Sequence, residues 1–328
     1  MRISMRMVNA RVALFGAAGY TGVELLKLLA IHPGVTLVAA ASDTRAGTPV
    51  DALTGGAPTG LSFVTTEEAL ATPAQVALLA IPPEPAVALA SKLAARGTKV
   101  IDLSNAHRAA GSGVYGLTSL FEPEIAAASL IANPGCYATC VITAVAPLVR
   151  HQRIERDVIV SAGSGVTGAG KSTDEALSLG ELHDNVRAYR VLRHQHVPEI
   201  EMALGALGER PRVILTTHLL PIARGIFATI TVKLRSPISS AALTEELRAD
   251  YAGDPTVTIV DAPEDVSLRK VVGTNQCMVG VAARDDICVV TSALDNLLKG
   301  AAGQAVENLN IVLGFPRTTG LLHLARHA

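Results

Sequence analysis

The chain contains 328 residues, of which 49% are hydrophobic and 17% are charged, enough apolar sequence to bury one or two ordinary cores. The formal net charge is −1 and no basic block stands out, which excludes the electrostatic footprint of a nucleic-acid-binding protein. Aromatic residues make up only 3% and Trp is absent, so few side chains could stack on bases. The class that remains is an enzyme acting on small molecules.

Two apolar segments could be considered as membrane-spanning or targeting segments, but neither pattern predicts a transmembrane helix. Residues 125–149 carry no charge, but Asn133-Pro134-Gly135 interrupts them and predicts a strand, a turn and a helix. The first 23 residues faintly resemble a secretory signal, yet no convincing small-residue cleavage site follows. The 4 cysteines lack the paired spacings of a disulfide framework or a zinc site. We therefore expect a cytoplasmic protein with reduced thiols, without a metal and without a membrane partner.

The first half of the chain alternates short apolar runs with helical patterns. A β-type run over 11–15 leads into a Gly-rich turn, and residues 21–31 suit a packed helix that His32-Pro33-Gly34 ends. Further apolar runs lie at 36–41, 76–81, 99–103 and 130–132, with a helical stretch over 84–95. This alternation predicts an α/β fold with a parallel, doubly wound sheet of the Rossmann type.

After about residue 150 the pattern becomes rich in β-type runs. These runs lie at 157–162, 212–219, 226–234, 256–260, 278–283 and 287–292. Short polar turns such as Arg284-Asp285-Asp286 favour a largely antiparallel sheet in an α+β domain. Residues 294–312 form a closing helical pattern. We expect a first domain over 1–135, completed by 295–328, and a second domain over 136–294.

The turn between the first strand and the first helix has the spacing GxxGxxG rather than the common GxGxxG. Gly16 would allow the tight turn, Gly19 would let backbone N–H groups approach a pyrophosphate, and Gly22 would permit close helix packing. The strand–turn–helix context is the one a dinucleotide-binding turn requires. A Gly-rich turn without a ligand is the alternative.

Polar residues follow the second predicted strand, where the ribose of a dinucleotide is usually recognised. Asp43 is suited to the ribose hydroxyls of NAD, whereas Ser42 and Arg45 could hold the 2′-phosphate of NADP. A polar loop without a ligand is again the alternative.

Cys136 stands where the strand at 130–132 ends and an apolar helix begins. The partial positive charge at a helix start favours the thiolate, which is the nucleophilic form of cysteine. A buried structural cysteine is the alternative, and we assign that role to Cys140, one turn further along. Cys136 is the candidate nucleophile.

The segment His194-Gln195-His196-Val197-Pro198-Glu199 places two imidazoles and a carboxylate close together. Histidine is the side chain that titrates near neutral pH without help, so one of the two could transfer protons for Cys136. A metal site lacks further ligands, and a solvated loop is the remaining alternative.

Residues 165–172 match the phosphate-loop pattern GxxxxGK[ST] in full. An apolar run ending in Asp261 even resembles the carboxylate that binds magnesium in such proteins. However, residues 173–184 are acidic and weakly apolar, which makes a poor partner helix. A nucleotide-binding protein is therefore the rival from a different functional class.

Together these residues resemble the N-acetyl-γ-glutamyl-phosphate reductases of arginine biosynthesis, relatives of the aspartate-semialdehyde dehydrogenases, nearly from end to end. The shared motifs are GAAGYTG at 16–22, IDLS at 101–104, YGL at 115–117, NPGCYAT at 133–139, SGVTGAGK at 164–171, HQHVPEI at 194–200, HLLPIARGI at 218–226 and DNLLKGAAGQAVENLN at 295–310. Several long motifs in order are far more specific than any short pattern.

The resemblance implies a reversible, NADP-linked reduction of an acyl phosphate to an aldehyde, with release of phosphate. Cys136 would be the nucleophile that forms a thioester, and His196, oriented by Glu199, would transfer protons. Arg108, Lys171, His194 and Arg224 would bind substrate, with His194 in reserve for proton transfer. NADP(H) would be held by Gly16, Ala18, Gly19, Tyr20, Thr21, Gly22, Ser42, Arg45, Ser164, Gly165 and Asn296. The resemblance also implies a homo-oligomer, a dimer or tetramer.

Two departures from the family pattern concern the substrate. Only residues 109–114 separate Arg108 from the YGL motif, where relatives have a longer segment, and the preceding motif reads Asn105-Ala106-His107-Arg108 instead of Ala-Asp-Phe-Arg. A related reductase acting on carrier-linked aminoadipyl phosphate or aspartyl phosphate is therefore the closest alternative.

Overall fold

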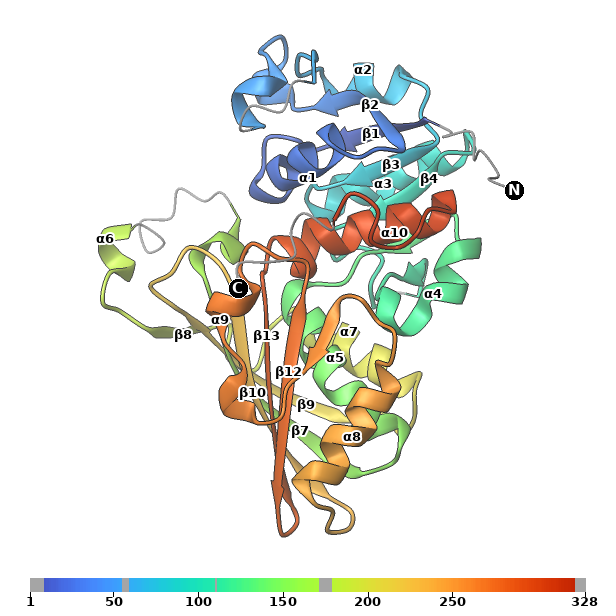
Figure 1. Ribbon diagram of the computed structural model, residues 1–328. Helices are drawn as coiled ribbons and strands as arrows, with labels where there is room; N and C mark the ends of the chain where they lie inside the picture. Colours follow the sequence, from blue (N-terminus) through green and yellow to red (C-terminus); the bar gives the residue numbers. More distant parts are fainter. Residues whose placement is uncertain (1–8, 55–58, 110, 171–178, 322–328) are drawn as a thin grey trace. The chain divides into compact units, whose positions relative to one another are not determined.

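The computed structural model describes residues 9–54, 59–109, 111–170 and 179–321, and its contacts divide the chain into two compact units (Figure 1). Of the described residues, the first unit comprises those up to Asn133 and those from Ala305 onward, and the second comprises those between Pro134 and Gln304. The division after Gln304 lies later than the expected residue 295, because the segment from Asp295 onward bonds within the second unit: the Asn296 side chain, for example, accepts the Gly225 N–H.

The first unit is built on a six-stranded parallel sheet in the order β2-β1-β3-β4-β6-β5. Its strands are β1 (Ala10–Phe15), β2 (Val35–Ala41), β3 (Val76–Leu79), β4 (Lys99–Asp102), β5 (Val114–Tyr115) and β6 (Leu130–Ala132). Most of these strand residues are buried, as expected for parallel strands between helical layers. The predicted Rossmann-type sheet is confirmed.

Four helices lie between strands of this sheet: α1 (Tyr20–Ala30), α2 (Thr66–Ala71), α3 (Pro83–Ala94) and α4 (Thr118–Ala127), with short 3-10 turns η1 (Asp43–Arg45) and η2 (Val50–Leu53). The late α10 (Gly303–Leu313) follows the strands of the second unit, and its residues from Ala305 onward belong to the first unit. One apolar layer joins α2 and α3 to β1 and β3 through small and apolar side chains, among them Phe15, Ala69, Leu79 and Leu89. The many alanines let these helices approach the sheet closely.

α10 is joined to the rest of the first unit by polar side chains. Asn310 bonds the His32 ring at 2.9 Å, and Asn308 donates to the Gly116 carbonyl at 2.9 Å and to the Asn133 side chain at 3.0 Å. The buried Glu307 accepts the Thr118 hydroxyl at 2.6 Å. The C-terminal helix therefore completes the N-terminal sheet unit.

The second unit is built on a seven-stranded mixed sheet in the order β11-β12-β13-β10-β7-β9-β8. Its strands are β7 (Ile154–Ser164), β8 (Arg187–Tyr189), β9 (Arg212–Leu219), β10 (Ile226–Leu234), β11 (Val257–Ile259), β12 (Cys277–Arg284) and β13 (Ile287–Leu294). The pairs β7–β9 and β11–β12 are parallel, and the other pairs are antiparallel. The largely antiparallel sheet predicted for this half is confirmed.

Helix α5 (Cys136–Arg150) forms the core of the second unit. Every residue from Tyr137 to Val149 is buried, which is expected of a helix that is apolar on all sides. The remaining helices are α6 (Leu179–Leu182), α7 (Val197–Gly205), α8 (Ser240–Asp250) and α9 (Leu268–Val271), with 3-10 turns η3 (Val166–Ala169) and η5 (Pro263–Asp265) and the π-helical turn η6 (Leu298–Ala302). The charge-free stretch at 125–149 is thus divided between α4, β6 and α5.

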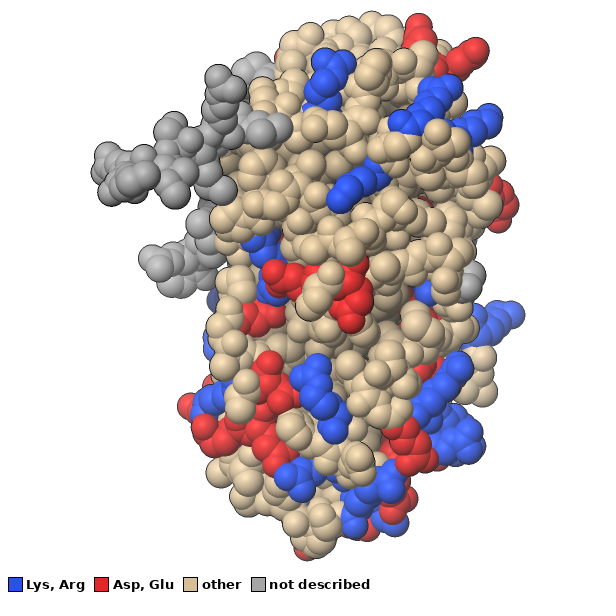
Figure 2. Space-filling view, turned by 90° about the vertical axis from the view of Figure 1, so that its right-hand side faces the viewer, with Lys and Arg blue, Asp and Glu red and all other residues tan. Residues whose placement is uncertain are grey.

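In the part of the chain that the structure describes, no helix is long and apolar enough to cross a membrane. On the face drawn in Figure 2, basic and acidic side chains are interspersed rather than sorted into separate areas. Several form surface ion pairs, for example Lys233 with Glu155 at 3.0 Å.

Candidate active site

The glycines of the first turn occupy positions with different space around them. Gly16 has φ +77°, and a Cβ there would stand 2.2 Å from the Ala80 carbonyl oxygen. A Cβ on Gly22 would stand 2.2 Å from the Gly16 carbonyl oxygen, whereas one on Gly19 would meet nothing closer than 3.5 Å. The fold itself therefore requires Gly16 and Gly22, and the bare backbone at Gly19 leaves room for a ligand at the start of α1.

Ala18, Gly19, Tyr20 and Thr21 form the loop end and first turn of α1, whose N-cap is Gly19 and has no side-chain cap. An uncapped helix start presents backbone N–H groups and partial positive charge to an anion. This geometry fits the pyrophosphate of a dinucleotide.

Asp43 is engaged within the protein. Its carboxylate accepts the Thr66 backbone N–H at 2.7 Å and the Thr66 hydroxyl at 2.8 Å, and these bonds lower the pKa of Asp43. Arg45 is exposed, and Ser42 lies beside Thr44, with the hydroxyls 3.5 Å apart. The Asp43 carboxylate, which could bind the diol of a free ribose, is therefore already used within the protein.

Cys136 is the first residue of α5, and Gly135 is its N-cap without a side-chain cap. The thiol is partly exposed and forms no disulfide, whereas Cys140, Cys277 and Cys288 are buried. Burial raises the pKa of Cys277 to about 11 and that of Cys288 to about 12, and raises the pKa of Cys140 as well. These three thiols are structural, and Cys136 has the position of a reactive one.

The imidazole of His196 and the carboxylate of Glu199 lie directly against the residue that precedes Cys136. The Gly135 N–H donates to Glu199 Oε2 at 3.2 Å, and His196 Nε2 lies 3.8 Å from Glu199 Oε1. A Cβ on Gly135 would stand 2.3 Å from His196 Nε2, so only glycine leaves space for the ring there. His196 is the N-cap of α7 and Glu199 lies in its first turn, so the starts of α5 and α7 meet at this point.

His194 is held in an aromatic cluster. Its ring lies 4.7 Å from the His196 ring and 5.2 Å from the Tyr137 ring, in both cases edge to face. Burial first, and Arg190 second, lower the pKa of His194 to about 4. The His196 N–H donates to His194 Nδ1 at 3.2 Å, so the neutral ring carries its proton on Nε2. His194 thus supports the backbone of His196.

The hydrogen bonds of residues 165–170 contradict the phosphate-loop hypothesis. The N–H groups of Gly165, Val166 and Thr167 donate to the carbonyls of Gly225, Ile222 and Ala223. The N–H groups of Gly168 and Gly170 are bonded within the loop, which forms the 3-10 turn η3. A phosphate loop must leave such donors for the phosphate. Lys171 and Ser172, the other residues of the motif, lie outside the described residues.

Asn296 links the two loops of this region. Its side chain accepts the Gly225 N–H at 2.7 Å and donates to the Thr167 hydroxyl at 3.1 Å. Ser164, at the end of β7, is buried and donates to the Gly165 carbonyl at 2.9 Å. Next to them, Arg224 has 27% of its side chain exposed and lies 3.6 Å from Asp295. Ser164, Gly165, Arg224 and Asn296 therefore form one continuous wall.

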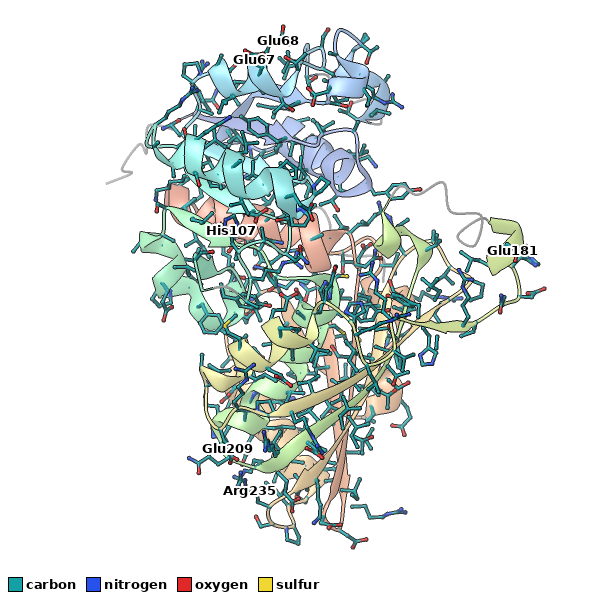
Figure 3. All side chains as sticks on the ribbon, turned by 180° about the vertical axis from the view of Figure 1, so that it is seen from behind. Glu67, Glu68, His107, Glu181, Glu209 and Arg235 are labelled. Atoms are coloured by element: carbon teal, nitrogen blue, oxygen red, sulfur yellow. The ribbon has the colours of Figure 1, made fainter. Side chains whose placement is uncertain are left out.

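Arg108 lies in the first unit and is largely committed to the backbone. Its Nε donates to the Asn133 carbonyl at 2.8 Å and its Nη2 to the Leu103 carbonyl at 2.7 Å. The neighbouring His107, labelled in Figure 3, bonds the buried Asp102 carboxylate through Nδ1 at 2.6 Å. This loop braces Asn133, which begins the turn that leads to Cys136.

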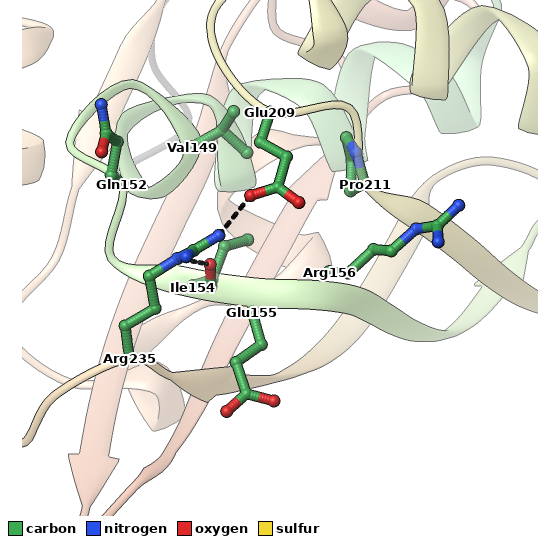
Figure 4. A pocket seen from close by; sticks show the side chains of 8 residues that line it. All are labelled: Val149, Gln152, Ile154, Glu155, Arg156, Glu209, Pro211 and Arg235. Carbon is green, nitrogen blue, oxygen red and sulfur yellow. Dashed lines mark hydrogen bonds and ion pairs between the residues drawn. The ribbon is translucent and has the colours of Figure 1, made fainter.

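A surface hollow of about 210 Å³ lies at the opposite end of α5 from Cys136 (Figure 4). Its lining residues are Val149, Gln152, Ile154, Glu155, Arg156, Glu209, Pro211 and Arg235. Arg235 donates to the Ile154 carbonyl at 2.7 Å and pairs with Glu209. Arg235 is thus already paired, and no predicted site residue lines this hollow. We therefore assign it no role.

Comparisons with known proteins agree with this arrangement. Residues 11–128 match the model "Semialdehyde dehydrogenase, NAD binding domain", and residues 136–296 match "Semialdehyde dehydrogenase, dimerisation domain". A protein of Chlorobaculum tepidum named N-acetyl-gamma-glutamyl-phosphate reductase is 39% identical over 98% of this chain and 99% of its own length. The chain belongs to the semialdehyde dehydrogenase family. It is therefore an oxidoreductase with an NAD(P)-binding domain.

Other members of the semialdehyde dehydrogenase family give the same result. A Bacillus cereus protein, also named N-acetyl-gamma-glutamyl-phosphate reductase, is 37% identical over 96% of this chain and 99% of its own length. Aspartate semialdehyde dehydrogenase II from Vibrio cholerae is 18% identical, with a TM-score of 0.76 over 93% of this chain and 99% of that chain. The latter comparison shows the shared fold.

Sequence reasoning did not anticipate two residues that lie beside the candidate site residues. Asp295 and Gly300 lie in the motif DNLLKGAAGQA, and a Cβ on Gly300 would stand only 2.8 Å from Cys136 Cβ. The available signal for Asp295 was a charged residue directly after an apolar strand, a position at which a charge is rarely buried unless it is paired. No signal indicated that Gly300 contacts Cys136.

Proposed function

We propose that this chain catalyses the reversible, NADP-dependent reductive dephosphorylation of N-acetyl-γ-glutamyl phosphate to N-acetylglutamate semialdehyde in arginine biosynthesis, through a thioester on Cys136. The observation that carries this proposal is the convergence of Cys136, His196 and Glu199 where the starts of α5 and α7 meet. The names of relatives 37% and 39% identical over nearly the whole chain support the substrate.

The steps follow from the groups around Cys136. His196 accepts the thiol proton, and the thiolate attacks the acyl-phosphate carbonyl carbon. The C–O bond to phosphate breaks, phosphate leaves with the proton that His196 carries, and the acyl group stays on Cys136 as a thioester. The backbone N–H of Cys136, at the start of α5, stabilises the oxyanion that forms during the attack.

When bound, NADPH supplies the hydride that converts the acyl group to the aldehyde. Breaking the C–S bond then returns Cys136 as thiolate. Glu199 serves this cycle as the group that orients His196, since its carboxylate is buried beside the ring. Because Glu199 also accepts the Gly135 N–H, it fixes His196 relative to the nucleophile.

NADP is the cofactor that the residues of the first unit fit. Gly16, Ala18, Gly19, Tyr20, Thr21 and Gly22 would hold the pyrophosphate, and Ser42 and Arg45 the 2′-phosphate. The engagement of both Asp43 oxygens by Thr66 supports this choice over NAD. Ser164, Gly165 and Asn296 of the second unit would lie by the nicotinamide.

Arg224 is the best-placed residue for an anionic group of the substrate, because its guanidinium is partly exposed and stands in the wall with Asn296. Arg108 would contribute its positive charge, while its Nε and Nη2 donate to the carbonyls of Asn133 and Leu103. Lys171 and His194 complete the proposed substrate set.

A homodimer or tetramer would form through the open face of the seven-stranded sheet. On that face Ile159 and Ile287 are exposed by 50% and 43%, and the matched model describes this region as a dimerisation domain. A two-fold interface brings the same surface of both subunits together, so these isoleucines would be covered on both.

The experiment is a comparison of substrates in the oxidative direction. NADP reduction is followed with phosphate and with N-acetylglutamate semialdehyde, aspartate semialdehyde or a carrier-linked aminoadipate semialdehyde. The proposal predicts phosphate-dependent turnover with the N-acetylated substrate at the highest kcat/KM. Preference for either other aldehyde would assign the chain to a sister activity, for which the short segment 109–114 would be the first place to look.

A further inference from the structure

One buried carboxylate takes no part in the steps above. Asp295 follows β13 and is fully buried. Its Oδ1 accepts the N–H groups of Leu297 and Leu298 at 2.8 and 3.1 Å. Its Oδ2 accepts the Gly273 N–H at 2.9 Å and lies 3.6 Å from Arg224 Nη1. A buried charge needs such a set of donors, and this one joins three separate segments.

The backbone of Asp295 leads to the nucleophile. Its carbonyl accepts the Gly300 N–H at 2.9 Å, the spacing of the π-helical turn η6. That turn brings Gly300 against Cys136, where an added Cβ would stand 2.8 Å from Cys136 Cβ and 3.2 Å from its Cα. Single π-turns are rare and often stand at functional sites. Asp295 thus holds Gly300 beside Cys136 through its backbone carbonyl, and it caps the start of η6 through its carboxylate.

We propose that Asp295 is a positioning residue that holds the Arg224 guanidinium toward an anionic group, a carboxylate or phosphate, of the substrate bound at Cys136. This inference rests on the proposed function of Arg224. The separation of 3.6 Å between Arg224 Nη1 and Asp295 Oδ2 is that of an ion pair, so the fixed carboxylate can orient a guanidinium that is partly exposed. Asp295 therefore links Arg224, through its carboxylate, to Gly300 and Cys136, through its backbone carbonyl.

The test is a double-mutant cycle with Asp295→Asn and Arg224→Gln. Asn keeps the shape and an acceptor for the two N–H groups of η6, but removes the charge that faces Arg224. Each single change should raise the KM for phosphate about tenfold, while the double variant should be little worse than either, because coupled residues are not additive. Asp261→Asn, which removes a surface partner of Arg248, is the matched control and should change nothing.

Three results would overturn the inference. A fall in KM for phosphate in Asp295→Asn would mean that the carboxylate only weakens the field of Arg224, and additive effects would mean that the two residues act separately. A purely structural role would lower the melting temperature and the fraction of active enzyme but leave KM unchanged. Asp295→Ser, which retains a helix-capping oxygen, is the second variant should the Asn side chain not be accommodated.

A readout independent of the substrate separates this inference from the proposed function. Iodoacetate and iodoacetamide both alkylate Cys136, and a well-placed Arg224 favours the anionic reagent. The ratio of their rates should fall in Asp295→Asn and in Arg224→Gln, even if the wild-type enzyme turns over none of the semialdehydes. An unchanged ratio in Asp295→Asn beside a reduced one in Arg224→Gln would reject the role of Asp295 alone.

Discussion

The two histidines of the site differ in what their surroundings allow. His196 faces a buried carboxylate, whereas His194 is surrounded by aromatic rings and has a pKa of about 4. A proton carrier must change its charge near the working pH, so the low pKa of His194 argues against that role. The carboxylate beside the His196 ring makes His196 the candidate.

Substitution separates the two roles. His196→Asn should lower kcat by about 10² to 10⁴, the range for a positioned acid and base. His194→Asn should cost much less, because Asn can still accept the His196 N–H. Steady-state kinetics of both variants checks this, and a larger loss in His194→Asn would exchange the assignments.

The low pKa of His194 also predicts how stability depends on pH. In the unfolded chain this ring binds a proton below about pH 6.5, but in the folded protein only below about pH 4. Protonation therefore favours the unfolded chain as the pH falls from 7 to 5, by about 2 kcal/mol. Urea unfolding at both pH values should show a smaller loss in His194→Asn than in the wild type. Equal losses would mean that His194 is not held neutral.

At the scale of the elements, α1 and the turn before it offer a test that separates binding from folding. Gly19→Ala adds a Cβ with no contact below 3.5 Å, so the fold should tolerate it, but the methyl group would stand where the pyrophosphate approaches. NADPH affinity should fall at least about tenfold with little change in melting temperature.

The matched variant is Gly22→Ala. Its Cβ would stand 2.2 Å from the Gly16 carbonyl oxygen, so the helix and turn must move apart, which costs about 1–3 kcal/mol or more. Calorimetric titration and thermal unfolding of both variants measure the two effects. Full NADPH affinity in Gly19→Ala would remove that turn from the cofactor site.

Elements with a strong pattern could be predicted from the sequence, and those held by distant contacts could not. The run 226–234 coincides with β10, because alternating side chains and flanking turns mark it. α7 was not predicted as a helix, since it has only nine residues and begins with Val197-Pro198. The closing helix was expected from residue 294, but the turn η6 comes first, because Asp295 accepts N–H groups from Leu297, Leu298 and Gly273.

The same distinction holds for the site. Cys136 and the His194–Glu199 segment could be found because their chemistry is local and their residue types are specific. The contact of Gly300 with Cys136 and the link of Asp295 to Arg224 could not, because both depend on how separate segments pack in the second unit.

At the scale of the whole molecule, the proposed reaction uses NADP rather than NAD. Arg45→Ala should weaken NADPH binding strongly and NADH binding little, since only NADPH carries the 2′-phosphate. Dissociation constants of both cofactors for both proteins check this prediction. If the wild type prefers NADH, or if the variant loses both equally, Arg45 does not read the phosphate.

The proposed reaction depends on a thioester at Cys136, and a rapid-mixing experiment without phosphate tests for this thioester most directly. Enzyme is mixed with NADP and N-acetylglutamate semialdehyde, and NADPH formation is followed by absorbance. The thioester mechanism predicts a burst of about one NADPH per chain. NADPH formation should then stop until phosphate is added, because the acyl group remains on Cys136. Cys136→Ser should bind NADPH normally and show no burst. Continuous turnover without phosphate, or a burst that persists in Cys136→Ser, would contradict it.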